Sequence, residues 1–331
     1  MKIAARGRWF ACGSVLALIA LACNIPGLAA QPGGETATLT ASLPPAPSAA
    51  ATQTATATAT IISPSPTFEP TPTRIVTHSL TPSTTVKAGK IIYDVTCVDT
   101  AADRRAPYGD SYPINLLERP FLQDMSYVAD LDIVSFNLGQ DEKFYYVSIE
   151  LVGANPNNAL GINYAVELDL DADGFGDRII IARPPYNVEW TTDNVQVVED
   201  TNHDTGGLSG EKSDAPLPGD GYDTVIFDGG RGESDDPDLA WVRVNAGKRA
   251  TVQFAFKLAL AGKRFMLGVF ADAGLKDIAS LDYVDRFTEL EAGSPQKEEE
   301  DYPLKALFGV DNTCREAYGF VGTGEEPQRC P

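Results

Sequence analysis

Apolar and polar residues alternate in short segments between residues 131 and 271, and this pattern is the main structural signal in the sequence. Residues 131–138 alternate in this way, turn at residues 139–142, and continue into residues 144–152, which are rich in aromatic and β-branched side chains. An alternation with a period of two predicts a strand, and a short polar turn between two strands predicts a β-hairpin. We therefore expect a first hairpin here.

Two further hairpins and three single strands are expected on the same grounds. The second hairpin joins residues 162–170 to residues 178–182 through a loop rich in Asp and Gly, and the third joins residues 240–244 to residues 250–259. Short strands broken by Gly, Asp, Asn and Pro turns predict a mainly β fold, an antiparallel β-sandwich with few short helices. The single strands are expected at residues 195–199, 224–228 and 265–271.

Helical spacing of apolar residues occurs in residues 277–292, which Gly293 follows as a stop signal. We expect a single helix over this segment. Its apolar positions are Ile278, Leu281, Val284, Phe287 and Leu290.

The N-terminal residues have the pattern of an export signal. Three basic residues, Lys2, Arg6 and Arg8, precede a charge-free and mostly apolar run over residues 9–22. This run is shorter than the roughly 20 residues that a membrane-spanning helix needs, but its length suits a signal peptide. We expect the rest of the chain to be exported from the cytoplasm.

The run ends in Ile19-Ala20-Leu21-Ala22-Cys23, and small residues directly before a cysteine resemble the lipobox of bacterial lipoproteins. The resemblance implies that residues 1–22 are a lipoprotein signal peptide and that Cys23 carries a lipid, although Ala20 stands where the family usually has leucine. One alternative is an ordinary signal peptide cleaved near residues 27–30, and another is an uncleaved anchor that runs through to Ala30. All three place the remainder outside the cytoplasm, and lipidation at Cys23 would anchor it to the membrane, in the cell envelope or at the cell surface.

Residues 23–89 are predicted to be a disordered, lipid-anchored stalk. From Gln31 to about Thr85 the sequence is almost entirely Thr, Pro, Ala and Ser. Such a segment cannot bury enough apolar surface to offset the loss of chain entropy on folding. We expect His78 to be solvated within the stalk, and residues 90–331 to form one folded domain.

The negative charge of the chain belongs to this predicted domain. The chain has 46 acidic and 26 basic residues, but residues 1–89 hold two of the acids and five of the bases, so residues 90–331 have a net charge of −23. An acidic body of this kind repels phosphate backbones and anionic lipid headgroups, which argues against binding to nucleic acid or to a membrane surface. Divalent cations and neutral polymers such as polysaccharides remain as partners.

Three cysteines lie in the predicted domain, and an oxidising compartment favours their pairing. We prefer a disulfide between Cys314 and Cys330, which closes a short C-terminal segment. The alternatives join Cys97 to either partner. A reactive Cys97 is disfavoured because His203 is the only histidine of the domain that could activate it.

The loop of the second predicted hairpin carries the strongest chemical signal. In Asp169-Leu170-Asp171-Ala172-Asp173-Gly174-Phe175-Gly176-Asp177, acidic oxygens stand at positions 1, 3 and 5 and glycine at position 6. The backbone carbonyl of Phe175 at position 7 and the carboxylate of Asp177 at position 9 complete the start of a calcium loop. Position 12 is Ile180 rather than the glutamate of an EF-hand, so the loop is similar to the Asp-rich loops of dockerin or thrombospondin-type repeats.

Neighbouring carboxylates in such a loop repel one another by roughly 3 kcal/mol per pair at an effective dielectric constant of 20. Their clustering therefore favours a bound Ca²⁺, which we expect to be structural rather than catalytic. The alternative is a solvated acidic turn without an ion.

A second polar segment, with Asp200, Asn202 and Asp204, repeats the alternate spacing without the glycine. It is a candidate for a second cation or for ligands to the first, and a plain polar loop is the alternative. His203 within it is a weak candidate for zinc, because no cysteine ligand lies near it in the sequence.

The order of these segments resembles DOMON-type and family-9-like carbohydrate-binding β-sandwiches. The resemblance covers about residues 125–275: Asp130-Leu131-Asp132 enters a strand, residues 144–151 (FYYVSIEL) follow, and a hairpin then bears Asp-x-Asp-x-Asp-Gly. It implies a β-sandwich, calcium as a structural ion, and glycan binding by aromatic side chains. The candidates for stacking on a sugar are Tyr186, Trp190 and Trp241, with packing in the core as the alternative for each.

No sequence motif for nucleophilic, metal-dependent or phosphoryl-transfer catalysis is present. We therefore expect a non-enzymatic surface lipoprotein whose calcium-stabilised domain binds glycans. A module that binds protein partners is the alternative, and a glycan hydrolase with a carboxylate pair is a weaker one.

Overall fold

The computed structural model describes residues 76–331 except residues 86, 108–116, 157–159, 185, 206–218, 230–235, 246, 275–276, 282–286 and 328. All the described residues belong to the second of two compact units, Glu69–Pro331. The predicted signal peptide, Cys23 and the first part of the predicted stalk lie outside the described residues.

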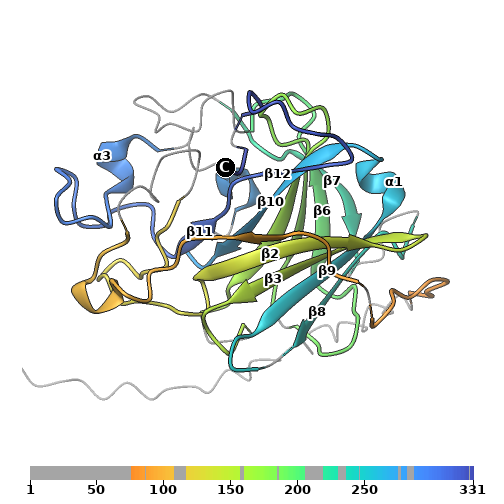
Figure 1. Ribbon diagram of the computed structural model, residues 1–331, viewed down its shortest axis with the longest axis horizontal. Coiled ribbons are helices and arrows are strands. Elements are labelled where there is room, and N and C mark those ends of the chain that lie inside the picture. Colours follow the sequence, from red (N-terminus) through yellow and green to blue (C-terminus); the bar gives the residue numbers. More distant parts are fainter. Residues whose placement is uncertain are drawn as a thin grey trace, which may run out of the picture. The chain divides into compact units, whose positions relative to one another are not determined.

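Two antiparallel sheets form the framework (Figure 1). The five-stranded sheet has the order β1-β2-β3-β9-β8, and the seven-stranded sheet has the order β11-β10-β4-β5-β6-β7, with β12 also paired to β10. The strands of the first sheet are β1 (Ile91–Tyr93), β2 (Ile133–Gln140), β3 (Phe144–Leu151), β8 (Ala240–Asn245) and β9 (Thr251–Lys257). Those of the second are β4 (Asn163–Asp169), β5 (Arg178–Ala182), β6 (Val195–Glu199), β7 (Thr224–Asp228), β10 (Phe265–Asp272), β11 (Val310–Asn312) and β12 (Glu316–Tyr318).

The predicted mainly β fold, an antiparallel sandwich with few short helices, is confirmed. The three predicted hairpins are β2–β3, β4–β5 and β8–β9, each paired in antiparallel register. The three single strands are β6, β7 and β10, and β6 and β7 have the predicted bounds.

The main core lies between the two sheets because alternate residues of each strand point inward. In β3, the inward residues are Tyr145, Val147 and Ile149, which share one buried cluster with Val166 and Leu168 of β4. The other residues of β3 point to the opposite face of the five-stranded sheet, which we call its outer face. This outer face carries the candidate binding site described below.

The helix predicted over residues 277–292 is wrong as a continuous element. The described residues there form a 3₁₀ helix, η3 (Ile278–Leu281), and a short helix, α3 (Glu289–Ala292). Thr288 has an extended backbone with ψ of 158°, and it forms a capping box with Glu291 that starts α3 at residue 289. The predicted stop at Gly293 is confirmed, since this residue caps the helix with φ of 77°.

Two other short helices are η1 (Ala101–Asp103) and α1 (Leu258–Ala261). In the part of the chain that the structure describes, no helix has the length and apolar character needed to cross a membrane.

The preferred disulfide is confirmed: Cys314 and Cys330 are bonded, with an S–S distance of 2.06 Å. Cys97 is buried in a separate small cluster with Phe121 and Met125. The bridge fixes the end of the chain next to β12.

The predicted boundary between stalk and domain at residue 89 is placed too late in the chain. Residues 76–85 and 87–89, which we call the strap, lie along the outer face of the five-stranded sheet, and Leu80 packs against the cluster of Phe144, Tyr146 and Trp241. Composition alone predicted disorder here because the strap is held mainly by hydrogen bonds to its backbone, which composition does not reveal.

Candidate functional site

The acidic loop between β4 and β5 turns tightly around Asp169, which ends β4 and is fully buried. Its Oδ1 atom accepts a hydrogen bond from Ala172 N at 2.6 Å, and its Oδ2 atom accepts one from Gly174 N at 3.1 Å. Ala172 and Gly174 have φ values of 66° and 100°, so the turn uses the left-handed region twice. This is the reason for glycine at position 6 of the loop.

Three of the predicted ligands converge in this loop. Asp169, Asp171 and Asp177 each offer a carboxylate oxygen, and these oxygens lie within 4.8 Å of one another. Asp173 is not among the three, and its Oδ1 atom instead accepts a hydrogen bond from Phe175 N at 2.9 Å. Carboxylate oxygens gathered in this way are the kind of donor set that hard divalent cations prefer.

Burial has the largest effect on the two shifted carboxyl groups of the loop. Burial raises the pKa of Asp169 to about 6, against the lowering effects of Arg315 and of the backbone N–H groups of Gly174 and Ala172. Burial also raises the pKa of Asp177, and the nearby carboxylate of Asp171 adds to this shift. A cation among these carboxylates would favour their ionised forms.

A buried arginine that the sequence analysis did not single out supports the loop from the C-terminal segment. Arg315 is almost fully buried, and its guanidinium lies 2.8 Å from Glu167 and 3.3 Å from Asp169. It also donates to Gly174 O at 2.8 Å, while Tyr222 donates its hydroxyl proton to Glu167. No local spacing in the sequence signals this contact, because Arg315 is 146 residues from Asp169.

The loop after β6 repeats the turn of the acidic loop. Asp200 accepts hydrogen bonds from the backbone N–H groups of His203 and Thr205, both at 2.9 Å. These donors stand three and five residues after the aspartate, as Ala172 and Gly174 do after Asp169. The two loops also touch, since Gly176 N donates to Thr205 O at 2.7 Å.

The geometry does not favour the second cation predicted at Asp200, Asn202 and Asp204. The side-chain amide of Asn202 donates to Asp204 and to Asp220, at 3.1 and 2.9 Å, so its N–H groups rather than its oxygen face the carboxylates. Asp204 is engaged by the backbone N–H groups of Asp220 and Gly221 at 3.0 and 2.8 Å. This loop thus orders the segment at residues 219–221. His203 lies 3.9 Å from Asp177 without a second histidine or cysteine near it among the described residues.

A second acidic group was missed by the sequence analysis because its members are far apart in the chain. Asp94, Glu118 and Asp311 bring carboxylate oxygens within 4.8 Å of one another, and Glu118 and Asp311 are buried. All three have further interactions, such as the hydrogen bond from Ile133 N to Asp311 at 2.7 Å. The group therefore belongs to the internal packing of the domain.

Two of the three aromatic residues predicted to stack on sugars are buried. Tyr186 lies in the main core, where its hydroxyl donates to Ile162 O and also lies 3.1 Å from Ala182 O. Trp241 is only 3% exposed, and its indole N–H donates to Asp238 O at 3.1 Å. Neither ring presents a free face, so the alternative of packing is correct for both.

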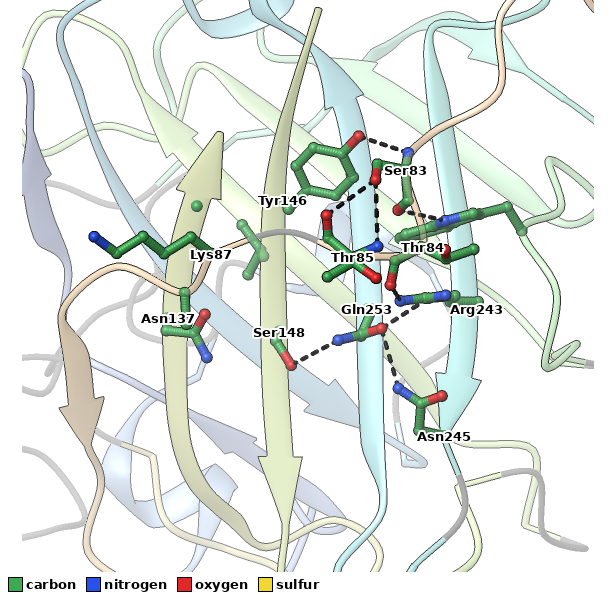
Figure 2. Close-up of a pocket in the computed structure, with 14 residues that line it drawn as sticks. Ser83, Thr84, Thr85, Lys87, Asn137, Tyr146, Ser148, Arg243, Asn245 and Gln253 are labelled. Atoms are coloured by element: carbon green, nitrogen blue, oxygen red, sulfur yellow. Dashed lines mark hydrogen bonds between the residues drawn. The ribbon is translucent and has the colours of Figure 1, made fainter. Parts of the chain in front are cut away.

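Trp190 is half-buried and borders a groove of about 330 Å³ on the outer face of the five-stranded sheet (Figure 2). Four polar residues cross this face in register on neighbouring strands, one each from β2, β3, β9 and β8. They are Asn137, Ser148, Gln253 and Arg243. The row was missed because each residue is only one polar position of an alternating strand, and the pairing of the strands brings the four together.

Hydrogen bonds fix the orientation of this polar row. Gln253 Oε1 accepts bonds from Arg243 Nε at 2.8 Å and from Asn245 Nδ2 at 3.1 Å. The Arg243 guanidinium carbon lies 4.6 Å from the centroid of the Trp190 ring. The groove therefore combines preorganised amide and guanidinium groups with the aromatic rings of Trp190 and Tyr146.

The strap forms one wall of the groove (Figure 2). Ser83 N donates to the Tyr146 hydroxyl at 2.8 Å, and Ser83 O accepts from Trp190 Nε1 at 3.1 Å. Thr84 O accepts a hydrogen bond from Arg243 at 2.9 Å. The end of the predicted stalk is thus part of the candidate binding site.

One buried carboxylate anchors the strap upstream of the groove. Asp238 lies 2.8 Å from His78 Nδ1 and accepts bonds from Ser79 N, Ser79 Oγ and Leu80 N at 3.0, 2.7 and 2.9 Å. The His78 ring also packs on Trp241, with ring centroids 4.5 Å apart. His78 is exposed, as predicted, but its contacts with Asp238 and Trp241 were not predicted, because Asp238 lies 160 residues away in the sequence.

Replacing Asp238 with alanine is expected to release the strap. Burial alone would raise the pKa of Asp238, but the hydrogen bonds from Ser79, His78 and Leu80 hold it below its usual value. A carboxylate with a lowered pKa stabilises the folded state above its unfolded pKa, and this contribution is lost as the pH falls through the folded pKa. Asp238→Ala at neutral pH, and the unaltered protein in acid, should therefore both expose the strap.

Limited trypsin digestion at the exposed Lys87 measures strap release, and Asp193→Ala, a change of an exposed aspartate, is the control. Cleavage of Asp238→Ala after Lys87 at the rate of the unaltered protein would show that the anchor does not hold the strap.

Comparisons with known proteins add no relative to this description. No protein-family model, no curated protein and no solved structure matches the chain.

Proposed function

We propose that the chain is an exported surface lipoprotein, anchored through Cys23, whose calcium-stabilised β-sandwich binds glycans without catalysis. The observation that carries this proposal is the groove on the outer face of the five-stranded sheet, where Trp190 lies beside a fixed row of amide and guanidinium groups. An aromatic ring supplies a flat apolar surface for a sugar ring. Amide and guanidinium groups supply hydrogen bonds to its hydroxyl groups.

The acidic loop supports the structural part of the proposal. Asp169, Asp171 and Asp177 present hard oxygen ligands at the ends of the central strands β4 and β5, and a Ca²⁺ ion there would fix the loop between them. The loop after β6 contacts the same turn, so an ion would order both loops. The stalk would then hold the sandwich away from the membrane.

A protein-binding module is the second candidate, and one observation favours it. Ile91, Tyr93 and Val95 are 47%, 74% and 47% exposed, and β1 is an edge strand of the five-stranded sheet. An exposed apolar edge can accept a strand from a partner protein. This edge lies outside the groove, so the two candidate functions can be tested by different substitutions.

Retention of the protein in polyacrylamide gels that contain soluble polysaccharides tests glycan binding. Trp190→Ala is expected to weaken retention about tenfold, since a stacked aromatic ring contributes roughly 0.5–1.5 kcal/mol beyond the area it buries. Tyr93→Ala, which removes an exposed ring outside the groove, is the matched control and should leave retention unchanged. Equal retention of Trp190→Ala and the unaltered protein would refute a stacking role. Loss of retention in Tyr93→Ala alone would instead indicate that the polysaccharide binds at the edge of β1.

A further inference from the structure

The lining of the groove differs in charge from the rest of the domain. Residues 90–331 have a net charge of −23. Among the residues that the structure describes, the groove is lined by two cationic residues, Arg243 and Lys87, and by no acidic residue. A local positive potential on such an acidic protein favours the binding of an anion at that place.

Arg243 is oriented for a further ligand. A guanidinium has five N–H groups, and the described residues accept hydrogen bonds from two of those of Arg243, through Gln253 Oε1 and Thr84 O. Its plane is held by these bonds and by the Trp190 ring at 4.6 Å. A fixed guanidinium with unused N–H groups matches the paired oxygens of a carboxylate or sulfate group.

Lys87 adds a second, adaptable charge from the strap. It is exposed, and no carboxylate pairs with it among the described residues. Figure 2 shows Lys87 extending above Asn137, at the end of the polar row away from Arg243. The two cations thus lie at opposite ends of one row, which suits a chain with repeated charges better than a single small anion.

Acidic residues next to the groove are already neutralised or engaged. Asp141 accepts a hydrogen bond from the Tyr146 hydroxyl at 2.7 Å, and Glu150 pairs with Arg249 at 3.0 Å. Burial alone would raise the pKa of Asp141, but hydrogen bonds from Tyr146, Lys143 and Phe144 lower it, so this carboxylate stays charged but engaged. Asp141 and Glu150 thus have partners of their own, and Arg243 and Lys87 are the charged groups that line the groove among the described residues.

We infer that the groove selects acidic polysaccharides, with the carboxylate or sulfate groups of successive sugars at Arg243 and Lys87 and a sugar ring on Trp190. The inference rests on the proposed glycan binding and narrows its ligand class. From the net charge of the domain, neutral polymers were expected as ligands. The distribution of this charge changes that expectation. The strap completes the site, because it provides Lys87 and the carbonyl group that orients Arg243.

Two matched pairs of polymers test this inference: dextran with dextran sulfate, and polygalacturonate with its methyl ester. Within each pair the backbone is the same and the charge differs. We expect stronger retention by the charged member of at least one pair, and the responding pair distinguishes sulfate from carboxylate recognition. Retention should persist at physiological salt, which screens the long-range repulsion more than a close ion pair in the groove.

Arg243→Gln and Lys87→Gln are each expected to weaken retention by the charged polymers about tenfold, which is typical of a lost charge-assisted hydrogen bond. Retention by any neutral polymer should change little. Arg249→Gln, which removes an arginine outside the groove, is the control. Lys87→Gln changes an exposed side chain, so its effect does not depend on the stability of the fold.

The possible failures are distinguishable. Equal retention by charged and neutral polymers, with both groove variants unaltered, would overturn charge selection and leave glycan binding standing. Charge selection by the groove would also be overturned if Arg249→Gln weakened retention as much as the groove variants do. The loss of any positive charge on the protein would then explain the weaker retention. If none of the four polymers retains the protein, the proposed function fails for these glycan classes and the inference fails with it.

Discussion

Replacement of Arg315 by methionine is expected to lower the free energy of unfolding by about 3–5 kcal/mol, because it leaves buried carboxylates without their charge partner. Arg315 lies between Glu167 and Asp169, at 2.8 and 3.3 Å, and all three side chains are at most 5% exposed. Methionine has a similar length, so little of the effect comes from a cavity. The variant also loses the hydrogen bond to Gly174 O inside the acidic loop.

Urea denaturation of the disulfide-bonded protein measures this effect, with Arg178→Met as the control. Arg178 pairs with Glu199 at 2.7 Å, but these side chains are 24% and 31% exposed, so their ion pair should contribute no more than about 1 kcal/mol. Adding Glu167→Gln to Arg315→Met should restore part of the lost stability. An Arg315→Met variant no less stable than Arg178→Met would show that the buried carboxylates are protonated or hydrated without the arginine.

Arg315 also connects the C-terminal segment to the acidic loop. Cys314 precedes it and is bonded to Cys330, while β12 follows it directly and pairs with β10. The covalent bridge and the strand thus restrict the position of the guanidinium. An acidic loop close to one end of the sandwich is thereby stabilised from a segment more than a hundred residues away.

The strands were predictable because their signal is local. Alternation over residues 131–138 predicted β2, and the aromatic and β-branched residues after it predicted β3. The turn expected at residues 139–142 starts too early, since β2 continues to Gln140. The acidic loop was predictable for the same reason, since its first six positions determine the turn around Asp169. Neither prediction needs knowledge of distant residues.

The groove could not be predicted because it depends on strand pairing and on the strap. Asn137, Ser148, Gln253 and Arg243 are far apart in the chain and become a row only through the order of the strands. The composition of the strap predicted disorder, whereas its backbone groups bind Asp238, Tyr146 and Trp190. The burial of Tyr186 and Trp241 could not be predicted either, because it depends on tertiary packing. The local sequence around an aromatic residue does not distinguish a ring in the core from a ring that binds a ligand.

Calcium is expected to raise the melting temperature of the chelator-treated protein by about 5–10 °C at 10 mM. An extracellular-type site has a dissociation constant of roughly 10⁻⁴ M, so the calcium concentration is about 100 times this constant. Binding then stabilises the folded state by about 2.7 kcal/mol. For a domain of this size each kcal/mol shifts the melting temperature by about 2–4 °C. The gain comes from an ion among Asp169, Asp171 and Asp177, whose ionised forms repel one another without it.

Substitutions in the two loops locate the calcium effect. Asp171→Ala should abolish most of the difference between calcium and chelator, since Asp171 is an exposed member of the converging group and its loss leaves the core intact. Asp204→Asn should keep the difference, because Asp204 is engaged by Asp220 and Gly221. A calcium effect that Asp204→Asn removes and Asp171→Ala preserves would move the ion to the loop after β6. Identical melting with and without chelator would mean that Arg315 and protonation of Asp169, whose pKa lies at about 6, are sufficient to hold the acidic loop.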